Sequence, residues 1–321
     1  MTKNQKPSFL SDLIENLRTN VTKDAVEKFR VDIWTRMSDL NNANNLRVFD
    51  GKKGGVLRGN AYSRKRNQDP ETGNVLCSKK RFKGNSLEVP YFQAVFNSLS
   101  RRIEFDEQSI QLVGYETPLM RKKAEKSNDV SKGRYISCDL LGITDCNQAL
   151  CIEGKVNPKA QETDIVYGIL ESYAYGVCVE YLISEHSSDF TQEVKLCVND
   201  YKCKLKIDDD REFTSAFSLA APRSYFREYF FCEKHAENQY IGQVSKILEY
   251  CAQSNSTKSN STKWYGFLVF QTPCKEESFE KKDPRNTKDE KKVELQFKDG
   301  LKVEKAECLE KLKRIVCSES V

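Results

Sequence analysis

The chain has 321 residues, enough to bury a substantial core in one large domain with additions or in two modest domains. Its 52 lysines and arginines and 47 aspartates and glutamates give a net charge of +5. A net charge of this size is by itself no evidence for a nucleic-acid partner. No stretch approaches the roughly 18 apolar residues of a membrane span, and the N-terminus carries no apolar signal core. We therefore expect a cytoplasmic protein without a membrane partner.

The cysteines and histidines exclude several further classes of site. The 12 cysteines stand singly, without a C-x-x-C pair, which predicts reduced, mostly buried thiols rather than disulfides. Only His186 and His235 could add imidazole ligands, so a structural zinc site and hydrolysis that uses a histidine base are disfavoured. No Walker-type phosphate loop occurs, which argues against an ATP-driven motor.

Two amphipathic helices are expected at the N-terminus. Apolar residues recur at helical spacing from Phe9 to Leu40, and Ser11 is suited to cap the first helix. Residues 1–50 are therefore expected to form a helical N-terminal segment.

A basic segment follows at residues 51–86. Between Gly51 and Asn85 it contains ten lysines or arginines against two acidic residues, together with several turn signals. Two interpretations are open: a solvated, poorly ordered linker, or an arm that contacts phosphate groups. In the second case the contacts come from three arginines and three lysines, which are Arg64, Lys65, Arg66, Lys79, Lys80 and Arg81.

A helix, a strand and a hairpin are expected next. Residues 88–102 show a third helical pattern that can cover a sheet, and residues 110–119 resemble a strand. After a charged loop, two short apolar runs at residues 135–144 and 149–156 are separated by turn-forming residues. A β-hairpin is the economical interpretation of these two runs.

The hairpin carries the most informative residues of the chain. If its centre is Cys146, then Asp139 and Glu153 face each other directly, and two opposed carboxylates repel. Such a buried pair persists most readily when a cation bridges it, and hard oxygen ligands suit Mg²⁺ or Mn²⁺. Lys155 returns to the face of Glu153 because side chains alternate along a strand. One face then carries two acids and one ammonium, which as a bare pattern is also compatible with a partly buried ion pair.

The remaining elements complete a mixed architecture. Residues 164–182 are expected to form a long packed helix, in which core packing rather than base stacking explains the tyrosines. Further expected elements are strands at 193–198, 202–207, 217–221 and 264–270 and helices at 240–251 and 302–317, the last within a densely charged tail that we do not assign to the core. The order of elements predicts an α/β protein with a mixed β-sheet flanked by helices.

Four segments together resemble a known family. They are residues 116–119 (ETPL), 134–142 (RYISCDLLG), 151–157 (CIEGKVN) and 169–175 (ILESYAY). Their succession is similar to that of the PD-(D/E)xK nuclease superfamily, and more narrowly to an uncharacterised bacterial branch of it. The resemblance implies a restriction-endonuclease-like core at residues 87–272, with a helical N-terminal addition and a charged C-terminal tail, residues 273–321, that includes a helix.

The resemblance also implies roles for individual residues. Asp139, Glu153 and the backbone carbonyl of Gly154 would hold Mg²⁺ or Mn²⁺, which polarises the scissile phosphate and activates water. Lys155 would stabilise the developing negative charge beside the attacking water. Glu88 would add a metal ligand or position that water, and Glu116 competes with Glu88 for this place.

Three functions follow from this resemblance. The first is a metal-dependent nuclease that hydrolyses phosphodiester bonds, with DNA as the expected substrate. The alternative is a catalytically silent module that binds nucleic acid or a protein on the same fold. A toxin or defence effector differs from the first in context more than in chemistry. A homodimer, or a partner protein bound through the terminal segments, also stays open.

Overall fold

We analysed a computed structural model of the chain. The residues that it describes are 9–42, 69, 71–78, 88–105, 108–121, 134–156, 164–207, 210–231, 238–254, 261–271, 276–282, 291–297 and 300–318. The proposed phosphate-contacting residues Arg64, Lys65, Arg66, Lys79, Lys80 and Arg81 lie outside these ranges.

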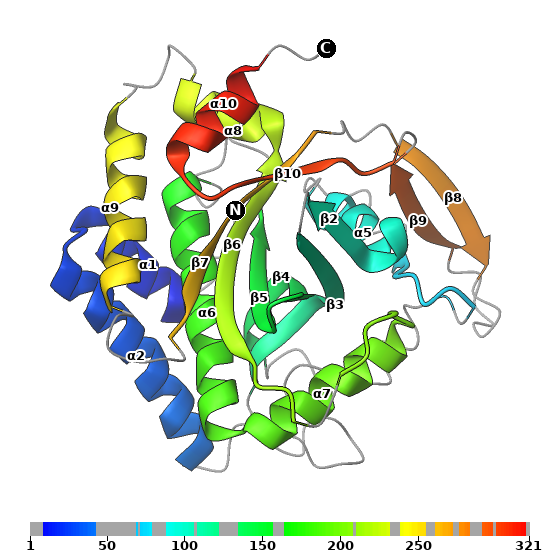
Figure 1. The fold of residues 1–321 in the computed structure, drawn as a ribbon, viewed down its shortest axis with the longest axis horizontal. Helices are drawn as coiled ribbons and strands as arrows, with labels where there is room; N and C mark the ends of the chain where they lie inside the picture. Colours follow the sequence, from blue (N-terminus) through cyan, green and yellow to red (C-terminus); the bar gives the residue numbers. More distant parts are fainter. Residues whose placement is uncertain are drawn as a thin grey trace, which may run out of the picture.

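A mixed seven-stranded sheet forms the centre of the described structure (Figure 1). Its strand order is β10-β7-β6-β5-β4-β3-β2, where the strands are β2 (Arg102–Phe105), β3 (Gln108–Arg121), β4 (Arg134–Thr144), β5 (Gln148–Gly154), β6 (Thr214–Pro222), β7 (Lys263–Phe270) and β10 (Val303–Ala306). The strands from β2 to β5 pair in antiparallel fashion, whereas β5, β6 and β7 are parallel. Parallel pairing requires crossover connections, and the connections between these strands contain helices, one of which covers a face of the sheet.

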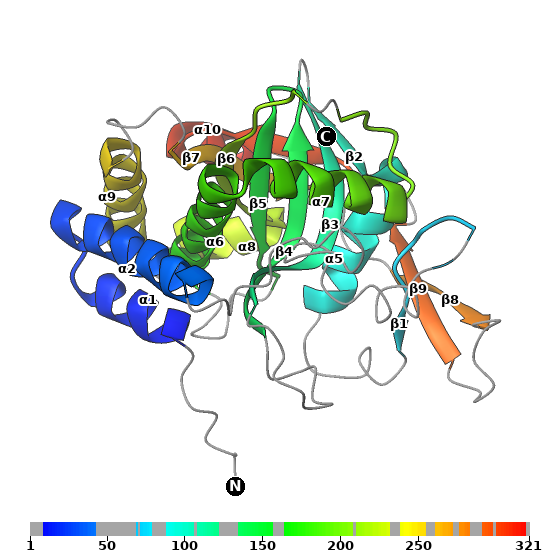
Figure 2. The same ribbon diagram turned by 90° about the horizontal axis from the view of Figure 1, so that it is seen from below.

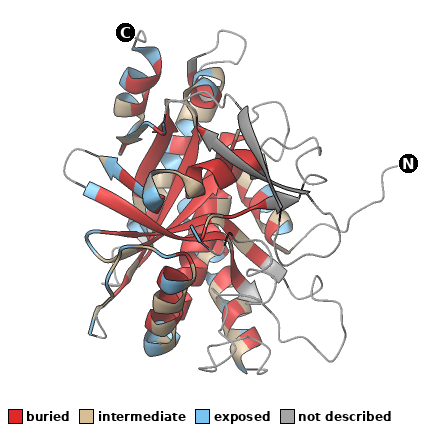
Figure 3. Cartoon of the chain, turned by 90° about the vertical axis from the view of Figure 1, so that its right-hand side faces the viewer, coloured by how far each residue is buried: buried red, intermediate tan, exposed pale blue. Residues whose placement is uncertain are grey.

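Helices on both sides of the sheet bury two apolar clusters. The first cluster packs β-sheet residues against α6 (Ile165–Glu185), and α1 (Phe9–Thr19), α2 (Lys23–Asn42) and α9 (Asn238–Ser254) pack against α6 in turn (Figure 2). The second cluster packs the opposite side of the strands against α5 (Glu88–Asn97). The central strands are consequently buried along most of their length (Figure 3).

The remaining elements lie around this core. They are α7 (Ser187–Asp200), α8 (Arg223–Phe231), α10 (Leu309–Cys317), the 3-10 helix η1 (Leu99–Arg101), and a second sheet of β1 (Cys77–Ser78), β9 (Lys291–Phe297) and β8 (Glu276–Lys282). The main sheet is curled, so that its two edge strands, β2 and β10, come into contact. Lys305 on β10 donates to Gln108, the first residue of β3 and the partner of Phe105 on β2, at 2.9 Å.

The structure confirms most of the expected elements and corrects three. The N-terminal helices, the hairpin, the long helix after it and the mixed sheet flanked by helices are present. Residues 193–198 are not a strand but part of α7, whose buried Phe190, Val194 and Cys197 recur at helical spacing. Residues 202–207 form neither strand nor helix. The C-terminal helix begins only at Leu309, and the preceding β10 joins the main sheet, so part of the charged tail belongs to the core.

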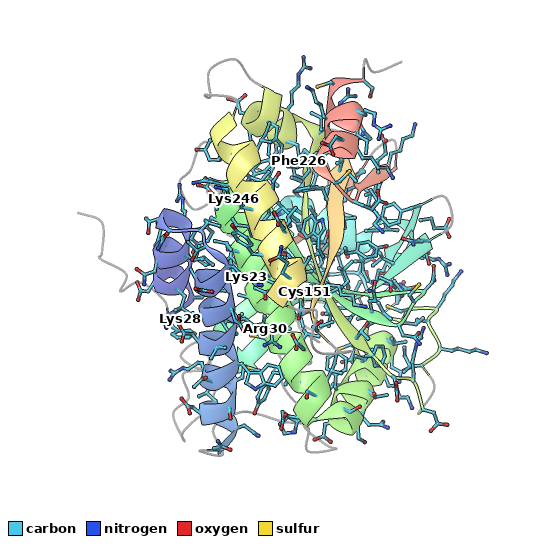
Figure 4. The ribbon with its side chains drawn as sticks, turned by 60° about the vertical axis from the view of Figure 1, so that its left-hand side comes forward. Lys23, Lys28, Arg30, Cys151, Phe226 and Lys246 are labelled. Atoms are coloured by element: carbon cyan, nitrogen blue, oxygen red, sulfur yellow. The ribbon has the colours of Figure 1, made fainter. Side chains whose placement is uncertain are left out.

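The cysteines agree with the expectation of reduced thiols. The nine cysteines whose side chains are described are all free, and five of them are buried: Cys138, Cys151, Cys178, Cys197 and Cys251. Cys151 lies in the interior between the sheet and the helical layer (Figure 4). Burial raises the pKa of its thiol well above the usual range, as does a hydrogen bond with Cys138. These thiols therefore pack as small apolar groups.

Candidate metal centre

The hairpin of β4 and β5 brings Asp139 and Glu153 together. Its turn includes Asn147, which adopts a φ of 61° that asparagine tolerates better than most residues. The pairing that follows aligns Leu140 with Ile152, so the next positions along the strands are Asp139 and Glu153. The backbone amide of Gly154 donates to Oδ2 of Asp139 at 2.8 Å. The expected opposition of the two carboxylates is therefore present.

Lys155 is fixed immediately after β5. Glu153 pairs with Leu219 in the parallel ladder to β6, and the amide of Lys155 continues this pairing by donating to the carbonyl of Ala220 at 2.9 Å. Both Glu153 and Lys155 are only 4% exposed. The Lys155 ammonium donates to Oε1 of Glu153 at 2.6 Å, so the two side chains share one face as the strand alternation predicts.

Helix α5 brings the third carboxylate, that of Glu88. The Phe92 ring occupies the space above Gly154, where an added Cβ would lie 2.1 Å from the ring. Glu88 is four residues before Phe92 on the same helix and so lies on the same helix face. One carboxylate oxygen from each of Glu88, Asp139 and Glu153 lies within 4.8 Å of the others. The close packing of Phe92 on Gly154 thus positions Glu88 at the hairpin.

Helix α6 contributes two residues that the sequence interpretation did not assign to the site. The Lys155 ammonium donates to Oε2 of Glu171 at 3.0 Å, and the hydroxyl of Tyr175 donates to Oε1 of Glu171 at 2.8 Å. The Lys155 stem passes over Gly168, where a Cβ would lie 3.2 Å from its Cε. Tyr175 is buried as expected of a core residue, but its hydroxyl is also part of this site.

Burial and mutual repulsion shift the pKa values of the acids upward. Desolvation, and then the charge of Glu88, raise the pKa of Asp139 to about 7, although Lys155 and the Gly154 amide act in the opposite direction. Desolvation followed by the charges of Asp139 and Glu171 raises the pKa of Glu153 well above its ordinary value. Desolvation also raises the pKa of Glu88. The cluster therefore favours uptake of protons or of a cation.

The pKa of the lysine also rises, but the neighbouring charges and not desolvation cause the rise. Desolvation alone would lower the pKa of Lys155, but Glu153 and Glu171 outweigh it, so the pKa rises well above its ordinary value and the ammonium stays charged. Among the described residues, one ammonium faces four carboxylates: Glu88, Asp139, Glu153 and Glu171. A surplus of acids of this kind favours the uptake of protons or of a further cation.

The donor set fits a hard divalent cation. All three converging ligands are carboxylate oxygens, which suit Mg²⁺, Mn²⁺ or Ca²⁺ better than softer metals. Glu88 and Asp139 are partly exposed whereas Glu153 is buried, so the group is open to solvent on one side. The three carboxylates could therefore hold a metal ion at a partly exposed position.

The structure separates the two candidates for the additional acid. Glu116 stands on β3 between Tyr115 and Thr117, which pair with Leu140 and Cys138, so its position lies beside Asp139. Its φ of 44° is in the left-handed region. Among the described residues, the converging carboxylates include Glu88 and not Glu116. A role for the backbone carbonyl of Gly154 as a metal ligand stays a prediction. The hydrogen bond between Gly154 and Asp139 is made by the backbone amide of Gly154.

The sequence contains one signal for Glu171. Residues 165–183 are buried almost throughout, and Glu171 and Glu180 are the two charged side chains among them. A carboxylate in such an apolar helix needs a partner, and Lys155 is the partner of Glu171.

Comparisons with protein-family models, with curated proteins and with solved structures gave no match. The resemblance to the PD-(D/E)xK superfamily therefore stays a prediction. No helix in the described part of the chain combines the length and the apolar character that crossing a membrane requires.

Proposed function

We propose that the chain is a metal-dependent nuclease of the PD-(D/E)xK kind, with a restriction-endonuclease-like core. The single observation that supports this proposal best is the convergence of Glu88, Asp139 and Glu153 within 4.8 Å beside the buried ammonium of Lys155. Hydrolysis of a phosphodiester needs a divalent cation and a positive group near the attacked phosphate. This cluster has ligands for the first and supplies the second.

Each residue has a defined task in this proposal. A bound Mg²⁺ or Mn²⁺ supplies Lewis-acid polarisation of the phosphate and a more acidic water. Asp139 and Glu153 hold the ion from the hairpin, and Glu88 holds it or orients the water from α5. Lys155 donates a hydrogen bond to the oxygen on which negative charge develops. The carboxylate of Glu171 and the hydroxyl of Tyr175 keep the lysine at that position.

The substrate and the partners are further parts of the proposal. DNA is the proposed substrate, and the lysines and arginines at residues 64–66 and 79–81 are proposed to contact its phosphates without reading bases. Action in the cytoplasm and assembly through the terminal segments belong to the same proposal.

Cleavage assays with matched variants test this function. We expect the purified chain to cut plasmid or single-stranded DNA in the presence of Mg²⁺ or Mn²⁺ and not with chelator. Lys155→Ala and Asp139→Asn should each lower the rate by about 10³-fold or more, in the range seen when a group that stabilises transition-state charge is removed. Lys246→Ala, a change at an exposed lysine on α9 (Figure 4), should leave the rate unchanged.

Two outcomes would count against the nuclease. If the parent protein cuts neither DNA form, or cuts no faster than Lys155→Ala, the chemistry is not carried by this site. If the parent protein nevertheless binds Mn²⁺ through Asp139, the catalytically silent binding module becomes the better description.

A further inference from the structure

Lys155 lies between two carboxylates that belong to different elements. Glu153 is at the end of β5 and is one of the three converging acids, whereas Glu171 is on α6 and is not among them. The ammonium contacts Oε1 of Glu153 at 2.6 Å and Oε2 of Glu171 at 3.0 Å. The same ammonium therefore bridges a candidate metal ligand and an acid outside the ligand group.

A divalent cation competes with this ammonium for Glu153. The contact at 2.6 Å already engages one oxygen of Glu153, and Lys155 is the ammonium that faces the acids in the described structure. A metal ion held by Glu153 repels an ammonium at the same carboxylate. Lys155 must therefore weaken its contact with Glu153 when the ion binds, yet the proposed chemistry needs it to stay beside the site.

Glu171 is built to keep the lysine there. Its Oε2 accepts from Lys155, and its Oε1 accepts from the Tyr175 hydroxyl one helical turn away, so both oxygens have partners and the carboxylate is fixed. Lys155 has little freedom to leave, because it is 4% exposed and packs against Gly168, and its ammonium lies 6.0 Å from the centre of the Tyr167 ring.

We propose that Glu171, oriented by Tyr175, is a positioning residue that takes over Lys155 from Glu153 when a divalent cation binds. In the metal-free protein the ammonium is shared between the two carboxylates. In the metal-bound protein it rests on Glu171, which frees Glu153 for the ion and leaves the ammonium beside it. This inference rests on the proposed metal site, and it makes Lys155 an internal competitor of the metal.

The alternative role for Glu171 is that of a fourth metal ligand. The two roles differ in how Glu171 depends on Lys155. If Glu171 acts through Lys155, its removal weakens metal binding only while the lysine is present. If Glu171 is a ligand, its removal weakens metal binding whether or not the lysine is present. A double-mutant cycle separates these cases.

The experiment measures Mn²⁺ affinity of the metal-free full chain by isothermal titration calorimetry. We expect Lys155→Met to bind Mn²⁺ about tenfold more tightly and Glu171→Gln about tenfold more weakly, within the usual range of coupling between two sites. In the Lys155→Met background, Glu171→Gln should change the affinity by less than about twofold. Tyr175→Phe should weaken binding in the same direction as Glu171→Gln but less, because it leaves the carboxylate in place.

Matched controls keep the outcome interpretable. Glu185→Gln changes an exposed acid on the same helix and should leave the affinity unchanged, and circular dichroism identifies any variant that does not fold. Equal weakening by Glu171→Gln with and without Lys155 would overturn the positioning role and make Glu171 a ligand. An unchanged or lower affinity in Lys155→Met would overturn the competition. Failure of the parent protein to bind Mn²⁺ would overturn the proposed nuclease as well.

Discussion

Two carboxylates on α6, the buried Glu180 and the partly buried Glu171, have opposite surroundings. Glu180 accepts from Arg30 of α2 at 2.5 Å with one oxygen (Figure 4), and from the amide and hydroxyl of Thr262 at 3.2 and 2.9 Å with the other. This carboxylate thus has one cationic partner and complete hydrogen bonding. It joins the N-terminal helices and the start of β7 to α6, as expected of a structural ion pair.

Glu171 belongs to a cluster that is not balanced. Its cationic partner, Lys155, is also the counter-charge for Glu88, Asp139 and Glu153. The comparison shows that the degree of burial of an ion pair says little about function, because both pairs are largely shielded from solvent. The distinguishing feature is the surplus of acids, which costs stability in the metal-free protein and could hold a cation.

The largest expected effect comes from breaking the balanced ion pair between Arg30 and Glu180. Arg30→Ala leaves Glu180 buried without its cation and should lower the free energy of unfolding by about 3–5 kcal/mol. Urea denaturation followed by circular dichroism measures this loss. Lys28→Ala, on the same helix, removes an exposed pair with Asp32 and should change stability by less than about 0.5 kcal/mol. A loss below about 1 kcal/mol in Arg30→Ala would contradict the structural role of this pair.

Metal binding should stabilise the protein through the unbalanced cluster and not through the Glu180 pair. At a Mn²⁺ concentration one hundred times the dissociation constant, the parent chain should gain about 2.7 kcal/mol in free energy of unfolding. Asp139→Asn should lose this gain, whereas Arg30→Ala should keep it because the Glu180 pair lies outside the ligand group. Thermal melts with and without Mn²⁺ make the comparison. An equal gain in the free energy of unfolding of Asp139→Asn would mean that the ion binds elsewhere.

Neutralising Glu153 and neutralising Glu180 should change the free energy of unfolding of the metal-free protein in opposite directions. Glu153→Gln removes a charge that its surroundings disfavour, so we expect stability at pH 7 to rise. Glu180→Gln weakens a satisfied pair and should cost about 1–3 kcal/mol. Parallel urea titrations with chelator present measure both changes. Destabilisation of similar size in both variants would mean that Glu153 is also a structural partner.

The smallest expected effect is the pH dependence of metal binding. The pKa of Asp139 is raised to about 7 in the metal-free protein, so a proton must leave before the carboxylate can hold a metal ion. Mn²⁺ affinity should therefore rise about tenfold from pH 6 to pH 8 and flatten above that range. The raised pKa also means that Asp139 costs metal-free stability as pH rises from about 4 to 7.

Calorimetry at several pH values measures this dependence. If Asp139→Asn retains weak Mn²⁺ binding, the part of the rise that is due to this carboxyl should be missing. A flat affinity from pH 6 to pH 8 in the parent protein would show that Asp139 is already ionised at pH 6.

The hairpin could be predicted from sequence because its geometry is local. The two-residue period of a strand and the symmetric spacing of Asp139 and Glu153 about the turn are enough to set their opposition. Glu88 entered only through the family resemblance, because no local rule places a helix against Gly154. Glu171 was missed because the direction in which a helical side chain meets the sheet depends on packing between distant segments.

The errors in the fold have a similar cause. The run at residues 193–198 is too short for its period to be decided alone, and the helical spacing becomes clear only when Phe190 is included. Strand β10 is a short charged segment, and its pairing with β7 depends on partners more than 30 residues away in sequence, from Val303 to Phe270. Long-range pairing of this kind leaves little trace in local composition.

The contact between Gly154 and Phe92 makes residue 154 a point at which the metal centre can be disabled without changing any ligand. Because a Cβ there would lie 2.1 Å from the buried Phe92 ring, a single methyl group must displace that ring, and we expect the shift to reach α5 or the end of β5. Either displacement moves Glu88 away from the hairpin acids. The smallest possible enlargement of a side chain, Gly154→Ala, should therefore disturb the three-carboxylate arrangement.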